Sequence, residues 1–187
     1  TLTPEIMNQI KRVRKTGFTL APEAGTDRLR KVINKGITEE DLLETCKDAH
    51  TLGWKLLKFY FMFGLPTETL EDVGAIVELV RRAAETSADR RLRINVSVAT
   101  FVPKPHTPFQ WEPQISIDEA FARIKLLKKN LLRGNYKLKW HDPYQSFLEG
   151  VMSRGDRPLS RVIKEAWQGG ARLYAWNEHF NFKIGQE

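Results

Sequence analysis

Residues 58–72, KFYFMFGLPTETLED, constrain the fold of this chain most strongly. They begin as an apolar and aromatic run without polar alternation, which is typical of a strand buried on both faces of a parallel sheet. Gly64 and Pro66 break the run, because glycine allows a positive φ and proline fixes φ and lacks an N–H donor. A helical pattern follows, which Thr67 or Thr69 can cap. The stretch predicts strand, turn and helix, with the turn where parallel α/β folds bind ligands.

The same order of elements recurs on both sides of this stretch. We expect strands at Phe18–Ala21, Lys55–Phe63 and Arg91–Phe101, each followed by a loop rich in glycine or proline. Three repeats of strand, loop and helix predict right-handed parallel βαβ units, and so an α/β fold of the partial (β/α) barrel type. The expected helices begin near Thr3 and cover Asp27–Asn34, Thr38–Leu52 with a capping box, and Thr69–Glu85.

The character of the chain changes after Pro113. Ile115–Leu132 predicts a long basic amphipathic helix, and shorter helical patches follow at Tyr144–Met152 and Leu159–Trp167. An aromatic stretch ends the chain. We therefore divide it into residues 1–113, the partial barrel, and residues 114–187, a helical C-terminal extension. Within the extension, Asn135–Glu187 is an appendage that packs on the core or reaches toward a missing neighbour.

Composition limits the classes of protein that fit. The chain has 187 residues, a formal charge of +7 and one cysteine, Cys46, which excludes an internal disulfide and fits a reducing compartment. Cys46 lies in a helical pattern, where we expect a buried structural thiol. No segment is long and apolar enough to span a membrane, so we expect a cytoplasmic protein without a membrane partner. The positive charge permits binding to RNA but does not require it.

Three motifs resemble a known family. PEAGTDRLRKVINKG, FYFMFGLPTETLED and VATFVPKPHTPFQW are similar, in order and across about Leu2–Trp111, to the later strands of radical S-adenosylmethionine (SAM) enzymes. The resemblance is closest to an uncharacterised group with an N-terminal cobalamin-binding-like domain, which SRGDR and NEHFNF in the tail also fit. It implies the second half of a six-stranded partial barrel. The implied cofactors are SAM and a [4Fe–4S] cluster. Whether cobalamin also takes part is left open, because a domain that binds it would lie outside this chain.

The sequence departs from that family at the cluster. Radical SAM enzymes hold the cluster with a C-x3-C-x2-C loop, and iron–sulfur clusters need thiolate ligands. This chain has only Cys46 and begins at Thr1 without an initiator methionine. We expect it to be the C-terminal part of a larger Fe–S oxidoreductase, inactive alone, with no catalytic or metal-binding residue of its own. In the full-length protein, the cluster would cleave SAM reductively.

Two charged residues match SAM-binding positions of the family. Glu23, just after the first strand, matches the position that contacts the ribose or the methionine amino group of SAM. A carboxylate there can accept hydrogen bonds from hydroxyl or ammonium groups, or can simply favour a helix N-terminus. Lys35 matches a basic position that pairs with the methionine carboxylate. Its alternative is a charge at a helix C-terminus.

The loop after the second strand matches the GxIxGxxE region, which packs on adenine. Tyr60 stands where the first glycine of that motif is expected, so the match is loose. Flat adenine needs apolar walls and backbone polar groups, although the same residues can be core. The implied adenine contacts are Met62, Phe63, Gly64, Leu65, Pro66 and Glu68.

The end of the third strand supplies the remaining implied contacts. Thr100, Phe101 and Val102 match the position where backbone groups hydrogen-bond adenine, and a strand end has free backbone groups to offer. His106 lies on the following loop, where it either faces substrate or is an ordinary exposed histidine.

Three functions remain open from the sequence. The first is the SAM-binding and substrate-facing side of a radical SAM enzyme, whose partner is the missing half of the barrel. The second is a basic RNA-binding or RNA-modification module, and the third is an α/β scaffold without catalysis. A half-barrel leaves strand edges and apolar faces uncovered, so we expect either self-association or a C-terminal tail that covers the opening.

Overall fold

The computed structural model describes Ile6, Gln9 and residues 17–87, 92–131 and 136–172. The expected helix from Thr3, the aromatic stretch after residue 172 and the NEHFNF motif therefore lie outside the described residues, and so does the expected covering tail.

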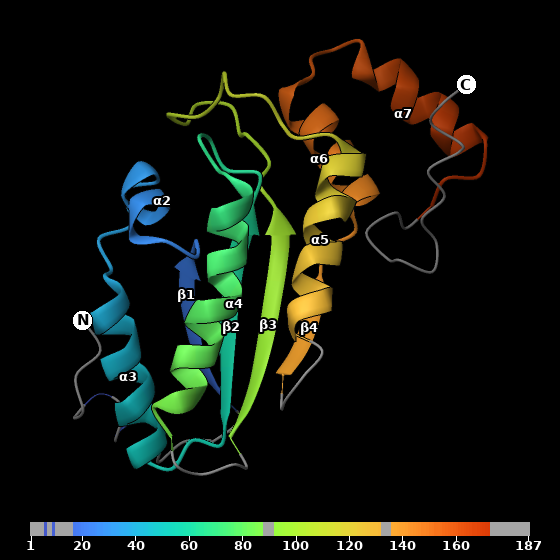
Figure 1. The fold of residues 1–187 in the computed structure, drawn as a ribbon. Helices are drawn as coiled ribbons and strands as arrows, with labels where there is room; N and C mark the ends of the chain where they lie inside the picture. Colours follow the sequence, from blue (N-terminus) through green and yellow to red (C-terminus); the bar gives the residue numbers. More distant parts are fainter. Residues whose placement is uncertain (1–5, 7–8, 10–16, 88–91, 132–135, 173–187) are drawn as a thin grey trace.

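The described strands form one parallel sheet in the order β1-β2-β3-β4 (Figure 1). All three neighbouring pairs are parallel, so the central prediction from the sequence is confirmed. The carboxyl ends of the strands meet at one edge of the sheet, as in a partial (β/α) barrel. The strands are β1 (Phe18–Glu23), β2 (Leu56–Phe63), β3 (Arg93–Thr100) and β4 (Tyr136–Trp140).

Helices follow the strands with the expected caps. Thr26, Thr38 and Thr69 each accept a backbone hydrogen bond at a helix start, and the last two form full capping boxes. Among the described residues, no helix is both long and apolar enough to cross a membrane. The helices are α2 (Asp27–Val32), α3 (Glu39–Thr51), α4 (Leu70–Glu85), α5 (Ile117–Leu131), α6 (Pro143–Arg154) and α7 (Leu159–Gln168).

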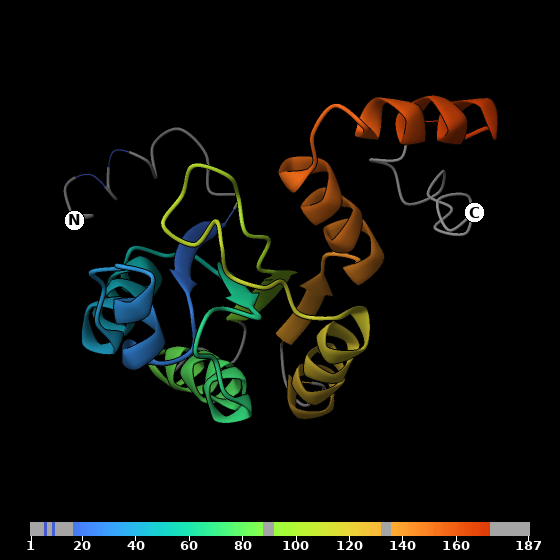
Figure 2. The same ribbon diagram turned by 90° about the horizontal axis from the view of Figure 1, so that it is seen from above.

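The helices α3, α4 and α5 cover one face of the sheet, side by side (Figure 2). Alternate residues of each of the first three strands are buried against them, since successive side chains of a strand point to opposite faces. Phe59 and Phe61 lie at the centre of this core, with Cys46 on the α3 side and Leu127 on the α5 side. The opposite face of the sheet carries the other half of the strand residues.

Strand β4 was not predicted. The sequence pattern predicts only helices after residue 113, yet Tyr136–Trp140 pairs with β3 from Ile94 to Val98. Lysines alternate with apolar residues in YKLKW, and half-buried Tyr136 and Leu138 pack on the core while the lysines stay exposed. The expectation of a purely helical C-terminal part is therefore wrong at β4. The division into domains at residue 113 stays a prediction.

Candidate SAM-facing edge of the sheet

The loops after β1, β2 and β3 all lie at the carboxyl edge of the sheet, and in Figure 1 the loop after β1 lies lower than the other two. We call these three loops the rim. The predicted site residues from Glu23 to His106 lie in or beside the rim, apart from Lys35, which follows α2.

Glu23 and Lys35 form an ion pair at the start of the rim. The Lys35 Nζ lies 3.4 Å from Glu23 Oε1, and the lysine and glutamate side chains are partly exposed, at 32% and 26%. Glu23 has φ 68°, a left-handed conformation that a non-glycine residue rarely adopts without support from its surroundings. The structure thus brings together the two charged residues that the sequence analysis named separately. Their exposure and long separation leave both groups accessible.

Arg30 holds the backbone between these two residues. Its side chain is 1% exposed, and it donates to the carbonyl oxygens of Ala24 (2.7 Å) and Ile37 (3.1 Å) and pairs with Asp27. Since one guanidinium binds both ends of the segment, Arg30 fixes Lys35 relative to Glu23. The sequence analysis missed this role, because an arginine within a charged helix gives no sign of burial.

A second polar network joins the first and second loops of the rim through Asp72. The Thr26 hydroxyl donates to Asp72 Oδ1 at 2.6 Å, the Thr69 N–H donates to Asp72 Oδ2 at 2.8 Å, and Arg28 pairs with the same carboxylate. Burial of the Asp72 carboxyl opposes ionisation, but these hydrogen bonds outweigh it and lower its pKa to about 2. Arg28 also donates to the Thr67 carbonyl at 3.0 Å. The network makes the two loops one rigid unit.

Glu68 closes the turn after β2. Both of its carboxylate oxygens accept from the Gly64 N–H, at 2.8 and 2.9 Å, and Arg123 Nε donates to Oε1 at 2.8 Å. The Glu68 side chain is 2% exposed, and Gly64 has φ 79°. The carboxylate of Glu68 is therefore occupied within the fold, and the contact of Glu68 with the cofactor stays a prediction.

The apolar part of the rim divides into core and accessible residues. Phe63, Gly64 and Leu65 are buried, so they shape the rim from below. Met62 and Phe101 are only partly buried, and both pack on a small cluster of Ala24, Leu29 and Leu65. These two side chains are the accessible apolar surface that we assign to the rim beside Glu23.

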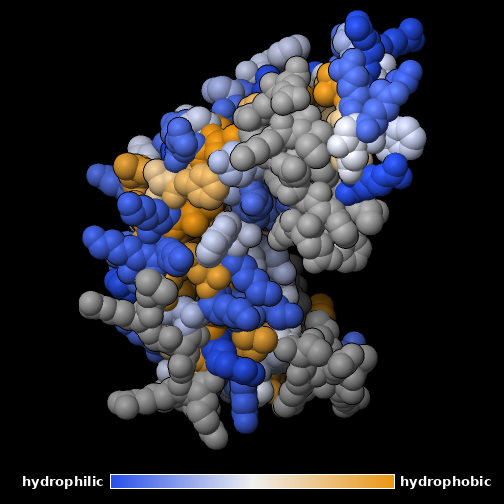
Figure 3. Space-filling view, turned by 90° about the vertical axis from the view of Figure 1, so that its right-hand side faces the viewer, coloured by the Kyte–Doolittle hydropathy of each residue, from blue (hydrophilic) through white to orange (hydrophobic). Residues whose placement is uncertain are grey.

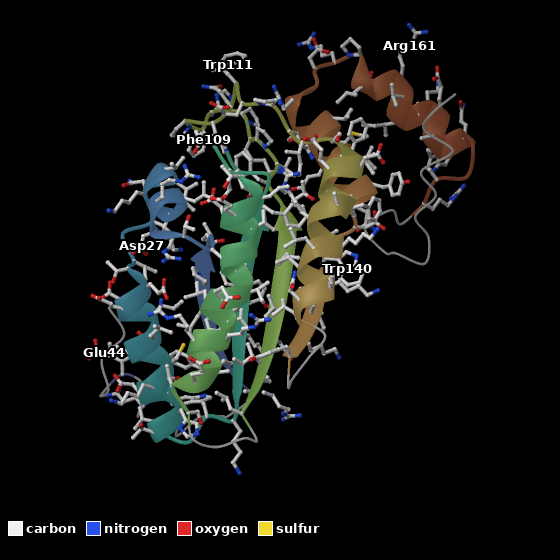
Figure 4. The ribbon with its side chains drawn as sticks, viewed as in Figure 1. Asp27, Glu44, Phe109, Trp111, Trp140 and Arg161 are labelled. Atoms are coloured by element: carbon white, nitrogen blue, oxygen red, sulfur yellow. The ribbon has the colours of Figure 1, made fainter. Side chains whose placement is uncertain are left out.

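The loop after β3 has fewer free polar groups for adenine than the sequence predicted. The Phe101 N–H is occupied, because it donates to the Phe63 carbonyl at 2.8 Å, and the buried Thr100 hydroxyl lacks a partner in the described part of the chain. Val102, like Pro66 on the loop before, is partly buried. His106 is exposed with φ 61° and lies on the loop that carries Phe109 and Trp111, above the strands in Figure 4.

The inner face of the sheet carries a further set of residues that the sequence analysis did not name. We use this term for the face opposite α3, α4 and α5. A pocket of about 270 Å³ lies at β2, β3 and β4, and Trp140 at its margin is labelled in Figure 4. Because side chains alternate between the two faces of a strand, the inner-face residues of β2 and β3 could have been predicted from the sequence. Lys139 could not, because it belongs to β4, which was not predicted. The inward-facing lining residues are Tyr60, Ser97, Ala99, Lys139 and His141.

Cys46 lies neither at the rim nor on the inner face of the sheet. It is fully buried in α3, and burial raises the pKa of its thiol to about 12. Within the described residues, no group of three histidine, cysteine or acidic side chains could hold a metal ion. The expected structural role of Cys46 agrees with its burial.

Comparison with known proteins finds a matching superfamily and a similar protein. Residues 1–80, which contain β1, β2 and the first two loops of the rim, match the Radical SAM superfamily. The chain is also similar to a particular protein, the uncharacterized protein MJ0966 of Methanocaldococcus jannaschii, with 32% identity over 163 residues. That alignment covers 87% of this chain and 35% of the relative, so the chain spans about a third of the relative's length.

The residues of this chain fit SAM but do not fit a [4Fe–4S] cluster. Glu23 and Lys35 offer opposite charges beside the accessible side chains of Met62 and Phe101, which suits the charged and flat parts of SAM. The single cysteine of the sequence is buried and protonated, whereas a [4Fe–4S] cluster needs several thiolates. The ligands of such a cluster therefore do not come from this chain.

Proposed function

We propose that this chain supplies the SAM-binding side of a radical SAM enzyme. The superfamily match supports SAM-dependent radical chemistry, and the geometry of the rim supports the role of this particular segment. The proposal does not include cobalamin, which neither comparison supports.

The Glu23–Lys35 pair carries the proposal. The methionine part of SAM has one ammonium and one carboxylate, so it complements a carboxylate and an ammonium group held close together. Lys35 Nζ and Glu23 Oε1 are 3.4 Å apart, which is long for a hydrogen bond, and an entering zwitterion can replace this contact with two of its own. The alternative role of Glu23 is to stabilise the N-terminus of α2, where the helix dipole favours a negative charge. That role explains neither its partner nor its strained backbone.

The remaining rim residues orient the cofactor. Met62 and Phe101 offer an apolar surface for adenine, and the Asp72 network keeps the loop after β2 fixed against the loop after β1. When SAM is bound beside a reduced cluster in such enzymes, it is the source of a 5′-deoxyadenosyl radical. Here the chain binds and positions SAM, and the cluster ligands belong to another part of the protein.

Calorimetric titration of the 187-residue chain with SAM tests the binding step. We expect Glu23→Gln and Lys35→Met each to weaken binding at least tenfold, since each loses one charge-assisted contact, worth roughly 1.5–3 kcal/mol. Glu44→Gln and Lys47→Met, both on α3, are charge-matched controls that leave the affinity unchanged. Absence of SAM binding in the unaltered chain, or equal losses in the controls, would contradict the proposal and favour a scaffold.

The radical step is tested in the protein encoded by the full reading frame. After anaerobic reconstitution with iron and sulfide and addition of a reductant, we expect 5′-deoxyadenosine, detected by mass spectrometry. Glu23→Gln lowers its yield at subsaturating SAM without changing the iron content. An unchanged yield in that variant would show that Glu23 is not a SAM contact.

A further inference from the structure

The described residues that line the pocket on the inner face include hydrogen-bond donors and no carboxylate. Tyr60, Ser97 and Lys139 are aligned in register across β2, β3 and β4, so they form one row perpendicular to the strands. Neighbouring strands lie about 4.8 Å apart, which places the three polar groups within reach of one small ligand. His141 adds a ring nitrogen where β4 ends. Hydroxyl, ammonium and imidazole groups can all donate to the same oxyanion.

The rows nearer the amino ends of the strands add further positive charge. Lys58, Asn95 and Lys137 form the next row across the same strands, and Arg93 follows at the start of β3. In the part of the chain that the structure describes, no ion pair is formed by Lys58, Arg93, Lys137 or Lys139.

Among the described strand residues, Glu23 at the rim is the only acidic one. It is already paired with Lys35. A group of cations without paired carboxylates raises the local concentration of anions, most strongly beside a pocket whose walls of low dielectric focus the field. The charge pattern therefore changes along the strands, from the acidic Glu23 at the rim to cations alone below it.

We propose that the inner-face pocket binds the anionic group, a phosphate or carboxylate, of a small-molecule substrate. The pocket selects an anion because every polar side chain in its lining can donate a hydrogen bond. This assignment as substrate rests on the proposed function, in which SAM lies at the rim above the pocket. The anion would hold one end of the substrate at Lys139, and the reacting part would face the rim. Lysines also protect sheet edges against association, but that role of Lys139 does not require the aligned Tyr60 and Ser97.

Titration with inorganic pyrophosphate, without SAM, tests the pocket alone. We expect Lys139→Met to weaken binding at least fivefold and Ser97→Ala to weaken it about twofold to fivefold, a range equal to roughly 0.5–1 kcal/mol. Lys125→Met is the matched control, because Lys125 is exposed on α5 at the other side of the sheet. Thermal unfolding confirms that each variant is folded. Equal losses for Lys139→Met and Lys125→Met would overturn the site.

Further probes separate the possible sources of the anion. Succinate in place of pyrophosphate distinguishes a carboxylate ligand from a phosphate ligand, and binding of either in a Lys139-dependent manner supports the proposal. If a single-stranded RNA oligonucleotide binds through Lys139 and neither small anion does, the ligand is a polymer and the proposal is wrong. If pyrophosphate binds but SAM does not, the anion site stands and its assignment to a substrate falls.

Discussion

Asp72 is the residue on which the two loops nearest the proposed cofactor site depend. Its carboxylate accepts from Thr26 and Thr69 and pairs with Arg28, so a single side chain from the first turn of α4 holds the loop after β1. The sequence shows Asp72 only as the third residue of a capping box. Its contacts across 44 and 46 residues of chain are visible only in the structure.

We predict that Asp72→Asn destabilises the fold and changes its dependence on pH. The folded pKa, about 2, lies below the ordinary value of 3.8, so the ionised carboxylate contributes stability above pH 4 that is lost as pH falls toward 2. The shift corresponds to about 2 kcal/mol. Urea unfolding between pH 2 and 7 measures it. The Asn variant should lose stability at pH 7 and show a shallower slope below pH 4, whereas Glu71→Gln, exposed on the same turn, should match the parent.

Gly25 permits the close approach of the loop after β1 to α4. A Cβ atom at this position would lie 2.5 Å from both the Asp72 carbonyl oxygen and the Ile76 nitrogen, and these backbone atoms cannot move aside freely. We predict that Gly25→Ala lowers the free energy of unfolding by about 1–3 kcal/mol. Gly74→Ala is the control, because its Cβ would meet nothing within 4 Å in α4. That change should stabilise the chain by up to about 1 kcal/mol. Equal effects in thermal unfolding would contradict this account.

At the scale of elements, the Glu68–Arg123 pair connects α5 to the turn after β2. Arg123 is 12% exposed and Glu68 2%, so loss of the arginine leaves a buried carboxylate with only the Gly64 N–H. We predict that Arg123→Met costs about 3 kcal/mol in chemical unfolding. The double variant Glu68→Gln/Arg123→Met should recover at least about 1 kcal/mol of that loss, because it removes the buried charge. Additive losses would show that the pair is not coupled.

The elements that the sequence predicted are those with a strong local pattern. The capping box at Thr38 and the apolar run of β2 depend on neighbours in the chain, and both lie as expected. Of the two caps predicted for the helix after β2, Thr67 and Thr69, the structure has Thr69. Strand β4 was missed because its alternating lysines resemble an exposed helix end, and only pairing with β3 makes it a strand. In the candidate site, too, only residues within a recognisable local pattern were predicted. Glu23 and Lys35 were found by motif, while Arg30 and Lys139 depend on contacts that no local pattern encodes.

At the scale of the whole molecule, the described sheet ends at β4, which has a neighbour only on the β3 side. Figure 3 looks onto the right-hand side of Figure 1, where β4, α5, α6 and α7 lie, and it shows apolar surface between hydrophilic side chains, mostly in the left part of the view. Trp140 on β4 is 43% exposed. Lys137 and Lys139 flank Leu138 on this edge and oppose unlimited strand pairing by charge repulsion. A limited assembly is therefore expected rather than fibres.

We predict that the 187-residue chain self-associates through this edge. Sedimentation velocity should show species larger than the 21.6 kDa monomer, with a proportion that rises with protein concentration. Trp140→Lys adds a charge to the apolar edge and should raise the dissociation constant at least tenfold, or about 1.4 kcal/mol. Trp111→Lys, on a loop where the indole is 84% exposed, is the matched control and should leave association unchanged. A chain that sediments as a monomer at every concentration would mean that the open edge is covered within the molecule.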